Sequence, residues 1–196
     1  MWDARRSGCG PRDGVSEAFE TARLRLVPAT AAHLAADAPT LAGLLGAAVP
    51  DDWPPETLPD ALPIFFSWLK NDPESVGWNL WYVISAEGVL VGSCGFVGRP
   101  SLEGEAEIGY AVLPAYRGCG YATEAVAALV AWAFGFPEVV RVVAQAEAGN
   151  GASVRVLEKC GFVCDGVGDE EGCVRFGVGR PRRCRNMGAG DPCQPE

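Results

Sequence analysis

The feature that most constrains this chain is an apolar segment that leads into a glycine-rich turn and then into a helix. Residues 105–113 are rich in strand formers, and Pro114 ends the segment because proline cannot donate to a sheet ladder. Arg117, Gly118 and Gly120 belong to the turn, and beyond it apolar residues recur at the helical period. Backbone N–H groups converge where a strand, a glycine turn and a helix N-terminus follow one another. This order predicts a site for an anion such as phosphate.

The spacing within the turn distinguishes between phosphate-binding motifs. A Walker loop needs Lys followed by Ser or Thr, and the turn contains no lysine. A dinucleotide loop needs a third glycine, where Thr123 stands. The pattern present is Arg-x-x-Gly-x-Ala, at Arg117, Gly120 and Ala122. It resembles the pyrophosphate loop with which the GNAT superfamily of N-acetyltransferases holds acetyl-CoA.

A second stretch of sequence carries the same resemblance. Residues 150–162 run from Asn150 and Ser153 to a Glu-Lys-Cys-Gly-Phe string. They are similar to the Asn-x-x-Ser…Glu-Lys-x-Gly-Phe signature of the branch that contains ribosomal-protein N-terminal acetyltransferases and many small-molecule relatives. The resemblance extends over roughly residues 20–179. It implies a GNAT-type α/β fold, in which helices flank a mixed, mostly antiparallel sheet with a splayed central strand pair.

The resemblance also implies how acetyl-CoA would bind as co-substrate. Its pyrophosphate would lie on the turn, and its pantetheine arm would pair with backbone exposed where the central strand splays near Tyr110 to Leu113. Backbone N–H groups of Val112 or Leu113 would polarise the acetyl oxygen. Asn150 would bond the pantetheine amides, and a helix N-cap is its structural alternative. The expected cofactor-binding residues are Val112, Leu113, Arg117, Gly118, Cys119, Gly120, Tyr121, Ala122, Thr123, Asn150 and Ser153.

Acetyl transfer to an amine needs a base for the amine and an acid for the departing thiolate. Glu107 matches the glutamate that many relatives place on this strand, so we expect it to take the amine proton directly or through water. Glu105 is the next candidate, and a solvated strand glutamate is the non-catalytic alternative. Leu157 occupies the position of the tyrosine that serves as acid in many relatives. The closer branch assigns that role to the serine found here as Ser153, for which a helix cap is the structural alternative.

Cys119 stands among the amides of the turn beside Arg117. A thiol at a helix N-terminus next to a cation is expected to be reactive, and bound CoA should protect it. The eight cysteines include no C-x-x-C pair, so the sequence predicts free thiols rather than a metal site or a disulfide framework.

The composition narrows the possible partners and location. A net charge of −9 disfavours nucleic-acid binding, which needs a basic face, and suits a cationic acceptor such as an amine. No apolar run is long enough to cross a membrane, and the N-terminus lacks the apolar core of a secretory signal. We therefore expect a cytoplasmic protein, and the sequence leaves the oligomeric state open, a homodimer included.

The chain divides into three parts by composition. Residues 1–20 and 180–196 are rich in Gly, Pro and Arg and are predicted to be disordered tails around a domain at 21–179. The segment 51–78 has no readable motif and is expected to wall the acceptor pocket; its tryptophans and Trp81 either line that pocket or pack in the core. The expected strands are 23–27, 79–85, 89–97, 105–113, 139–146, 162–167 and 172–178. One expected helix begins after Thr30, and three others cover 62–70, a stretch that starts at 122, and 153–159.

Two functions remain open on this basis. The first is an N-acetyltransferase that uses acetyl-CoA to modify a primary amine of a small molecule or of a protein N-terminus. The second is a catalytically weak GNAT-fold module that binds CoA for regulation.

Overall fold

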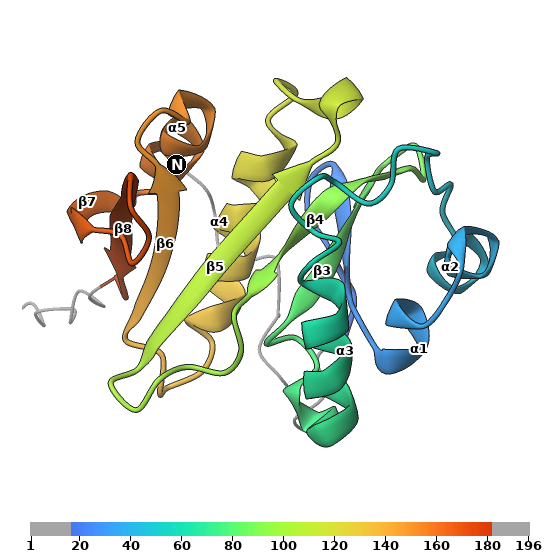
Figure 1. Ribbon diagram of the computed structural model, residues 1–196, viewed down its shortest axis with the longest axis horizontal. Helices are drawn as coiled ribbons and strands as arrows, with labels where there is room; N and C mark the ends of the chain where they lie inside the picture. The colour runs from blue at the N-terminus through green and yellow to red at the C-terminus, as the bar shows by residue number, and fades with distance from the viewer. Residues whose placement is uncertain (1–16, 182–196) are drawn as a thin grey trace, which may run out of the picture.

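An eight-stranded sheet forms the centre of the computed structural model, which describes residues 17–181. The strand order is β1-β2-β3-β4-β5-β6-β8-β7, and only the β5–β6 pair is parallel. Helices lie on both faces of the sheet (Figure 1). This mostly antiparallel sheet with flanking helices confirms the predicted fold class.

The elements follow the chain in a regular order (Figure 1). They are β1 (Phe19–Glu20), β2 (Leu24–Pro28), α1 (Ala31–Leu34), α2 (Ala38–Leu45), α3 (Leu62–Asn71), β3 (Leu80–Ser85), β4 (Leu90–Phe96), β5 (Glu105–Val112), α4 (Tyr121–Ala133), β6 (Arg141–Glu147), α5 (Gly151–Lys159), β7 (Val163–Val167) and β8 (Cys173–Gly179). Short 3₁₀ turns at Pro73–Ser75 and Pro114–Tyr116 complete the series.

The two faces of the sheet are covered to different extents. One core joins α4 and α5 to residues of β2 through β6 and of β8. A second, smaller core joins α1, α2 and α3 to β2, β3 and β4 on the other face. Figure 1 shows that no described helix lies in front of β5, β6 and β8 on this second face. That part of the sheet is therefore open, and its outward side chains include Glu105, Glu107, Arg141, Gln145 and Arg175.

An aromatic cluster fixes α4 against the sheet. The Trp132 ring lies 4.8 Å from Trp78, 5.4 Å from Trp81 and 4.8 Å from Phe136, measured between ring centroids. Trp78 and Trp81 are 3% and 0% exposed, so both belong to the core and do not line a pocket. Of the other tryptophans in question, Trp53 is partly buried against the smaller core, and Trp68 on α3 is 36% exposed.

Two short elements were not predicted. Phe19–Glu20 falls within the predicted N-terminal tail but pairs with β2, and the Phe19 ring packs edge-on against Trp81. Helix α2 was also missed, although Asp37 caps its N-terminus by accepting a hydrogen bond from Thr40 N–H. Residues 1–16 and 182–196, which make up most of the two predicted tails, lie outside the described residues.

Candidate functional site

The parallel strands β5 and β6 separate partway along their length. They pair only at Glu105↔Arg141, Ala106↔Val142 and Glu107↔Val143. Beyond that point β5 continues to Val112 beside β4, and β6 continues to Glu147 beside β8. Figure 1 shows the resulting wedge-shaped gap between the two arrows. The predicted splay is therefore present, and it starts directly after Glu107 rather than near Tyr110.

The direction of the β5 peptide groups decides which amides face the gap. The N–H of Leu113 donates to Val91 O on β4 at 2.9 Å. Because peptide groups alternate in direction along a strand, those of Tyr110 and Val112 point the other way, toward β6. Val112 thus has the orientation expected of a donor to the acetyl oxygen. Leu113, the alternative proposed from the sequence, does not, because its N–H is already bonded within the sheet.

The glycine turn has the geometry of an anion site. Gly118 and Gly120 have φ of 79° and 82°, which a residue with a side chain rarely adopts. Gly120 is the N-cap of α4, and no side chain caps the first turn of this helix. The N–H groups at the start of α4, from Tyr121 to Thr123, cannot bond within the helix and so remain available to a ligand. The exposed Arg117 donates from Nε to Val112 O at 3.0 Å, which holds its guanidinium beside the turn.

The first turn of α4 also contains a carboxylate with three donors. Glu124 accepts from Thr21 Oγ1 at 2.6 Å, and from the backbone N–H and Nε of Arg23, both at 2.8 Å. Burial alone would raise the pKa of Glu124, but the hydrogen bonds from Thr21 and Arg23 outweigh it and lower the pKa. Sequence analysis missed these residues because their contacts join segments about a hundred positions apart.

A pair of hydroxyls spans the other side of the gap. Asn150 caps α5 by accepting a hydrogen bond from Ser153 N–H at 3.0 Å. The Tyr110 hydroxyl lies 2.7 Å from Ser153 Oγ and donates to the Ser153 carbonyl at 3.0 Å. Burial raises the pKa of Tyr110 to about 12, so this phenol stays protonated near neutrality. Leu157 is fully buried, so the position of the usual tyrosine belongs to the core.

Tyr110 could have been found from the sequence by strand periodicity. Side chains of a strand alternate between faces, so Tyr110 lies on the side of Ile108, toward α4 and α5. The family resemblance places the acidic tyrosine on the helix after Asn150, so Tyr110 counts there only as an available hydroxyl outside that position. In the structure this hydroxyl reaches Ser153 from the facing strand.

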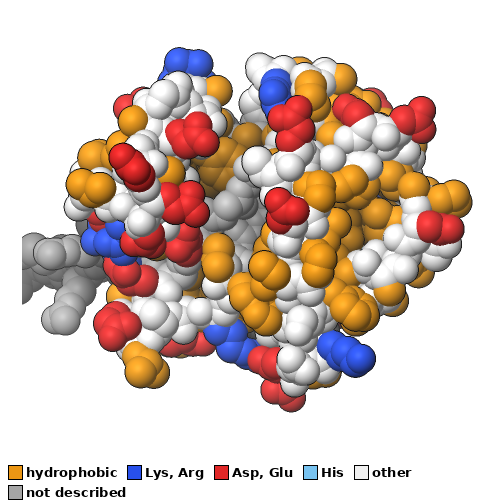
Figure 2. Space-filling model, viewed as in Figure 1, with side chains coloured by type: hydrophobic (Ala, Val, Ile, Leu, Met, Phe, Trp, Pro, Cys, Tyr) orange, Lys and Arg blue, Asp and Glu red, His pale blue; other side chains and the backbone are white. Residues whose placement is uncertain are grey.

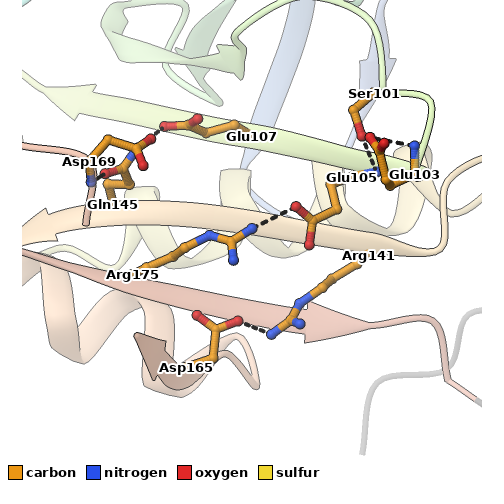
Figure 3. A network of polar contacts seen from close by, with 9 residues as sticks. All are labelled: Ser101, Glu103, Glu105, Glu107, Arg141, Gln145, Asp165, Asp169 and Arg175. Atoms are coloured by element: carbon orange, nitrogen blue, oxygen red, sulfur yellow. Dashed lines mark hydrogen bonds and ion pairs between the residues drawn. The ribbon is translucent and has the colours of Figure 1, made fainter. Parts of the chain in front are cut away.

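Glu105 and Glu107 lie on the open face and have different partners (Figure 3). Glu105 forms an ion pair with Arg175, with Oε2 and Nη2 2.6 Å apart. Glu107 Oε1 instead accepts from the neutral Gln145, whose Nε2 is 3.1 Å away. Among residues 17–181 the structure records no cation paired with Glu107. It is therefore the carboxylate of this pair that is free to take a proton from an incoming group.

Gln145 is itself held in place by the turn between β7 and β8. Its Nε2 donates to Asp169 Oδ2 at 2.8 Å, and its Oε1 accepts from Asp169 N–H at 2.6 Å. A further ion pair, between Arg141 and Asp165, lies beside this network (Figure 3). Figure 2 shows this face as a hollow with acidic side chains along its margin. Carboxylates there outnumber arginines, which suits a cationic ligand.

Three general features of the described residues concern metal binding, membrane-spanning helices and cysteines. Residues 17–181 contain no group of three or more His, Cys, Asp or Glu side chains arranged to hold a metal ion. Within the same range no helix is both long and apolar enough to cross a membrane. The cysteines of this part are free thiols, of which Cys94 is buried and Cys119 is exposed.

Comparison with known proteins agrees with the geometry. The family profile described as the acetyltransferase (GNAT) domain matches residues 23–163. An N-acetyltransferase of Bacillus subtilis named YjdG, itself uncharacterised, is 33% identical over 120 residues, which cover 61% of this chain and 71% of that protein.

Solved structures show the same fold at low sequence identity. The ribosomal-protein-S5-alanine acetyltransferase of Vibrio fischeri aligns with a TM-score of 0.58 and 17% identity, over 83% of this chain and 96% of its own. The spermidine N-acetyltransferase of Vibrio cholerae, solved with CoA and spermine, aligns with a TM-score of 0.51 and 20% identity, over 61% and 73%. The match of the family profile to most of the domain, together with the YjdG relationship, shows that this chain belongs to the GNAT family of acetyltransferases.

Proposed function

We propose that this protein is an acetyl-CoA-dependent N-acetyltransferase that transfers the acetyl group directly to a primary amine in a ternary complex. The observation that carries the proposal is the gap between β5 and β6, which has an unpaired carboxylate, Glu107, at its narrow end. The hydroxyls of Tyr110 and Ser153 lie at the same gap on the opposite face of β5. A base and an acid thus flank one opening in the sheet.

The residues around the turn fit acetyl-CoA. The uncapped amides at the start of α4, the turn around Gly118 and Gly120, and the Arg117 side chain would hold the diphosphate. The peptide groups of Tyr110 and Val112, which point toward β6, would pair with the pantetheine arm as if it were an extra strand. Acetyl-CoA supplies an activated thioester, so the protein needs to provide position, a base and donors to the acetyl oxygen.

Glu107 would receive the proton of the attacking amine. Gln145 orients the carboxylate through Oε1, and within residues 17–181 no partner is recorded for Oε2. That oxygen can accept a proton from the amine or from an intervening water. The Val112 N–H, which points into the gap, would bond the acetyl oxygen as negative charge develops on it.

Ser153 would protonate the departing thiolate, with Tyr110 behind it. Their oxygens are 2.7 Å apart and either can donate, so the phenol can turn its proton from the Ser153 carbonyl to Oγ when Ser153 loses its own. The phenolate that this leaves would take up a proton from water before the next turnover. Tyr110 keeps its proton near neutrality because its pKa is raised to about 12.

The acidic open face supports a cationic amine as acceptor. Both a protein N-terminus and a small polyamine have this chemistry; the names of the two solved neighbours mention an alanine of a ribosomal protein and spermidine. We favour an acceptor that carries positive charge beyond the reacting amine, because the carboxylates of this face exceed its arginines.

A matched pair of variants tests the proposal. Glu107→Gln and Glu105→Gln remove neighbouring carboxylates from the same face of the same strand. With spermidine, free amino acids and N-terminal peptides as acceptors, and acetylated product measured by mass spectrometry, Glu107→Gln should lower kcat by about 10²- to 10⁴-fold. Glu105→Gln should change it less than about fivefold, because a half-exposed ion pair contributes little.

Calorimetry with CoA, compared with turnover of the amines, separates the two functional classes. Both variants should bind CoA like the parent, since neither carboxylate contacts the turn. Equal activity of Glu107→Gln and the parent would contradict the role of Glu107 as base. Tight CoA binding by the parent without turnover of any amine would favour the regulatory module instead.

A further inference from the structure

Arg23 connects the start of β2 to the glycine turn and to the first turn of α4. Its Nε forms an ion pair with Glu124 Oε2 at 2.8 Å, and its Nη1 donates to the Cys119 carbonyl at 2.9 Å. Its guanidinium carbon also lies 5.3 Å from the centroid of the Tyr121 ring. One side chain from a distant segment therefore contacts three consecutive parts of the predicted phosphate site.

Glu124 makes such a cation necessary. Its carboxylate lies in the first turn of α4, next to the amides that would receive a diphosphate. The Glu124 carboxylate and a diphosphate bound at these amides would repel each other. Water screens this repulsion less because the Glu124 side chain is only 17% exposed. The ion pair with Arg23 and the hydrogen bond from Thr21 offset this negative charge.

The remaining nitrogen of Arg23 faces the turn. A Cβ placed on Gly120 would be 3.3 Å from Arg23 Nη2, so this nitrogen lies over the Gly120 backbone at the entrance to the amides. Among residues 17–181 no acceptor is recorded for Nη2. The Arg23 side chain is 51% exposed, so Nη2 can reach a ligand without displacing the contacts of Nε and Nη1.

We propose that Arg23 is a second arginine of the phosphate site, which fixes the turn through the Cys119 carbonyl and donates from Nη2 to a phosphate of CoA. This inference rests on the proposed function in that it takes CoA as the ligand. It assigns Arg23 a contribution of its own, beyond the neutralisation of Glu124. Arg117 and Arg23 would then approach the phosphates from the two ends of the turn.

A double-mutant cycle measured by calorimetry with CoA tests the assignment. The variants are Arg23→Gln, Glu124→Gln and the two combined. Arg23→Gln should weaken CoA binding about 10- to 100-fold, the usual effect of losing hydrogen bonds to a charged group. In the Glu124→Gln background the same change should still weaken binding at least about fivefold, and the dependence of affinity on salt should become shallower.

Arg25→Gln is the matched control. Arg25 lies on the same strand but donates to the Leu45 carbonyl at 2.8 Å, away from the turn. Its loss should leave CoA affinity within about twofold of the parent. Melting curves without CoA compare the folding of all variants. If Arg23→Gln fails to fold, Arg23→Lys serves instead, because lysine keeps the positive charge but lacks the several N–H donors of the guanidinium. Arg23→Lys should bind CoA several-fold more weakly than the parent.

The outcomes are distinct. Unchanged CoA affinity in Arg23→Gln, complete recovery of affinity when Glu124→Gln is added, or parent-like binding by Arg23→Lys overturns the assignment while the proposed function stands. A folded parent that gives no heat with CoA contradicts the proposed function itself.

Discussion

Replacing Tyr110 with Phe removes one oxygen and separates a structural role of this residue from a chemical one. The hydroxyl joins β5 to α5 through Ser153, at 2.7 Å from Oγ and 3.0 Å from the carbonyl. As a structural contact, a hydrogen bond of this kind contributes about 1 kcal/mol to stability. For a chain of 196 residues this corresponds to a decrease in Tm of about 2–4 °C. If only this energy were lost from the transition state, kcat would fall about fivefold.

A proton-relay role gives a much larger effect. Loss of a general acid typically lowers the rate about 10²- to 10⁴-fold, which is about 3–5 kcal/mol of transition-state stabilisation. We expect at least a 100-fold fall in kcat for Tyr110→Phe. The melting temperature should fall by only about 2–4 °C, and CoA affinity should stay close to that of the parent. Ser153→Ala should cause a similar fall, and the double variant should be no worse than the poorer single one, because both act in one relay.

The assay needs a direct readout of acetylated product. Dyes that trap released thiol would also react with the exposed Cys119 and Cys164, so mass spectrometry is preferable. Tyr116→Phe is the control, because the described residues include no hydrogen-bond partner for the Tyr116 hydroxyl. A Tyr110→Phe enzyme that keeps about a fifth or more of the parent kcat, at a melting temperature 2–4 °C lower, would refute the relay and leave Tyr110 as a structural contact.

Three further predictions concern reactivity and stability. Saturating CoA should slow alkylation of Cys119 at least about tenfold and leave Cys164, which is also exposed, unaffected, as read by peptide mass spectrometry. Equal protection of both or of neither contradicts the placement of the ligand on the turn. Burial raises the pKa of Cys160 from 9.0 to about 11 and that of Tyr110 from 10.0 to about 12, so the unfolded chain loses these protons first. The free energy of unfolding should therefore fall as pH rises from 9 to 12 in urea titrations, and constant stability up to pH 11 would disagree. Trp132→Ala should lower the free energy of unfolding by about 3–5 kcal/mol, because the ring is 4% exposed and packs on four other aromatic rings; a loss below about 1 kcal/mol in urea unfolding would show that the cluster does not stabilise the fold.

Local patterns explain what the sequence predicted well. The glycine turn, the cap at Asn150 and the strand 105–113 each depend on residues close together in the chain, so their spacing alone indicates the structure. Gly161, the glycine of the Glu-Lys-Cys-Gly-Phe string, has the positive φ of 83° that ends α5, as a glycine directly after a helix favours.

The misses have a common physical origin in long-range contacts. The orientation of the Leu113 amide depends on which neighbour β5 pairs with, and strand propensity carries no such information. The clamp of Arg23 on Glu124 joins two segments that only the folded sheet brings together. Trp78 and Trp81 are core residues because α4 covers them with Trp132, a partner that their own segment does not reveal.

The spacing of Glu107 and Tyr110 along β5 has a consequence for how the two protons travel. The residues are three positions apart, an odd number, so their side chains project to opposite sides of the strand. The amine proton would leave to Glu107 on the solvent-facing side of β5. The proton for the thiolate would come from Tyr110 and Ser153 on the helix-covered side, so the strand would separate the two. Inserting a single residue between the two positions would turn both toward the same side and abolish this separation, even though every individual side chain is retained.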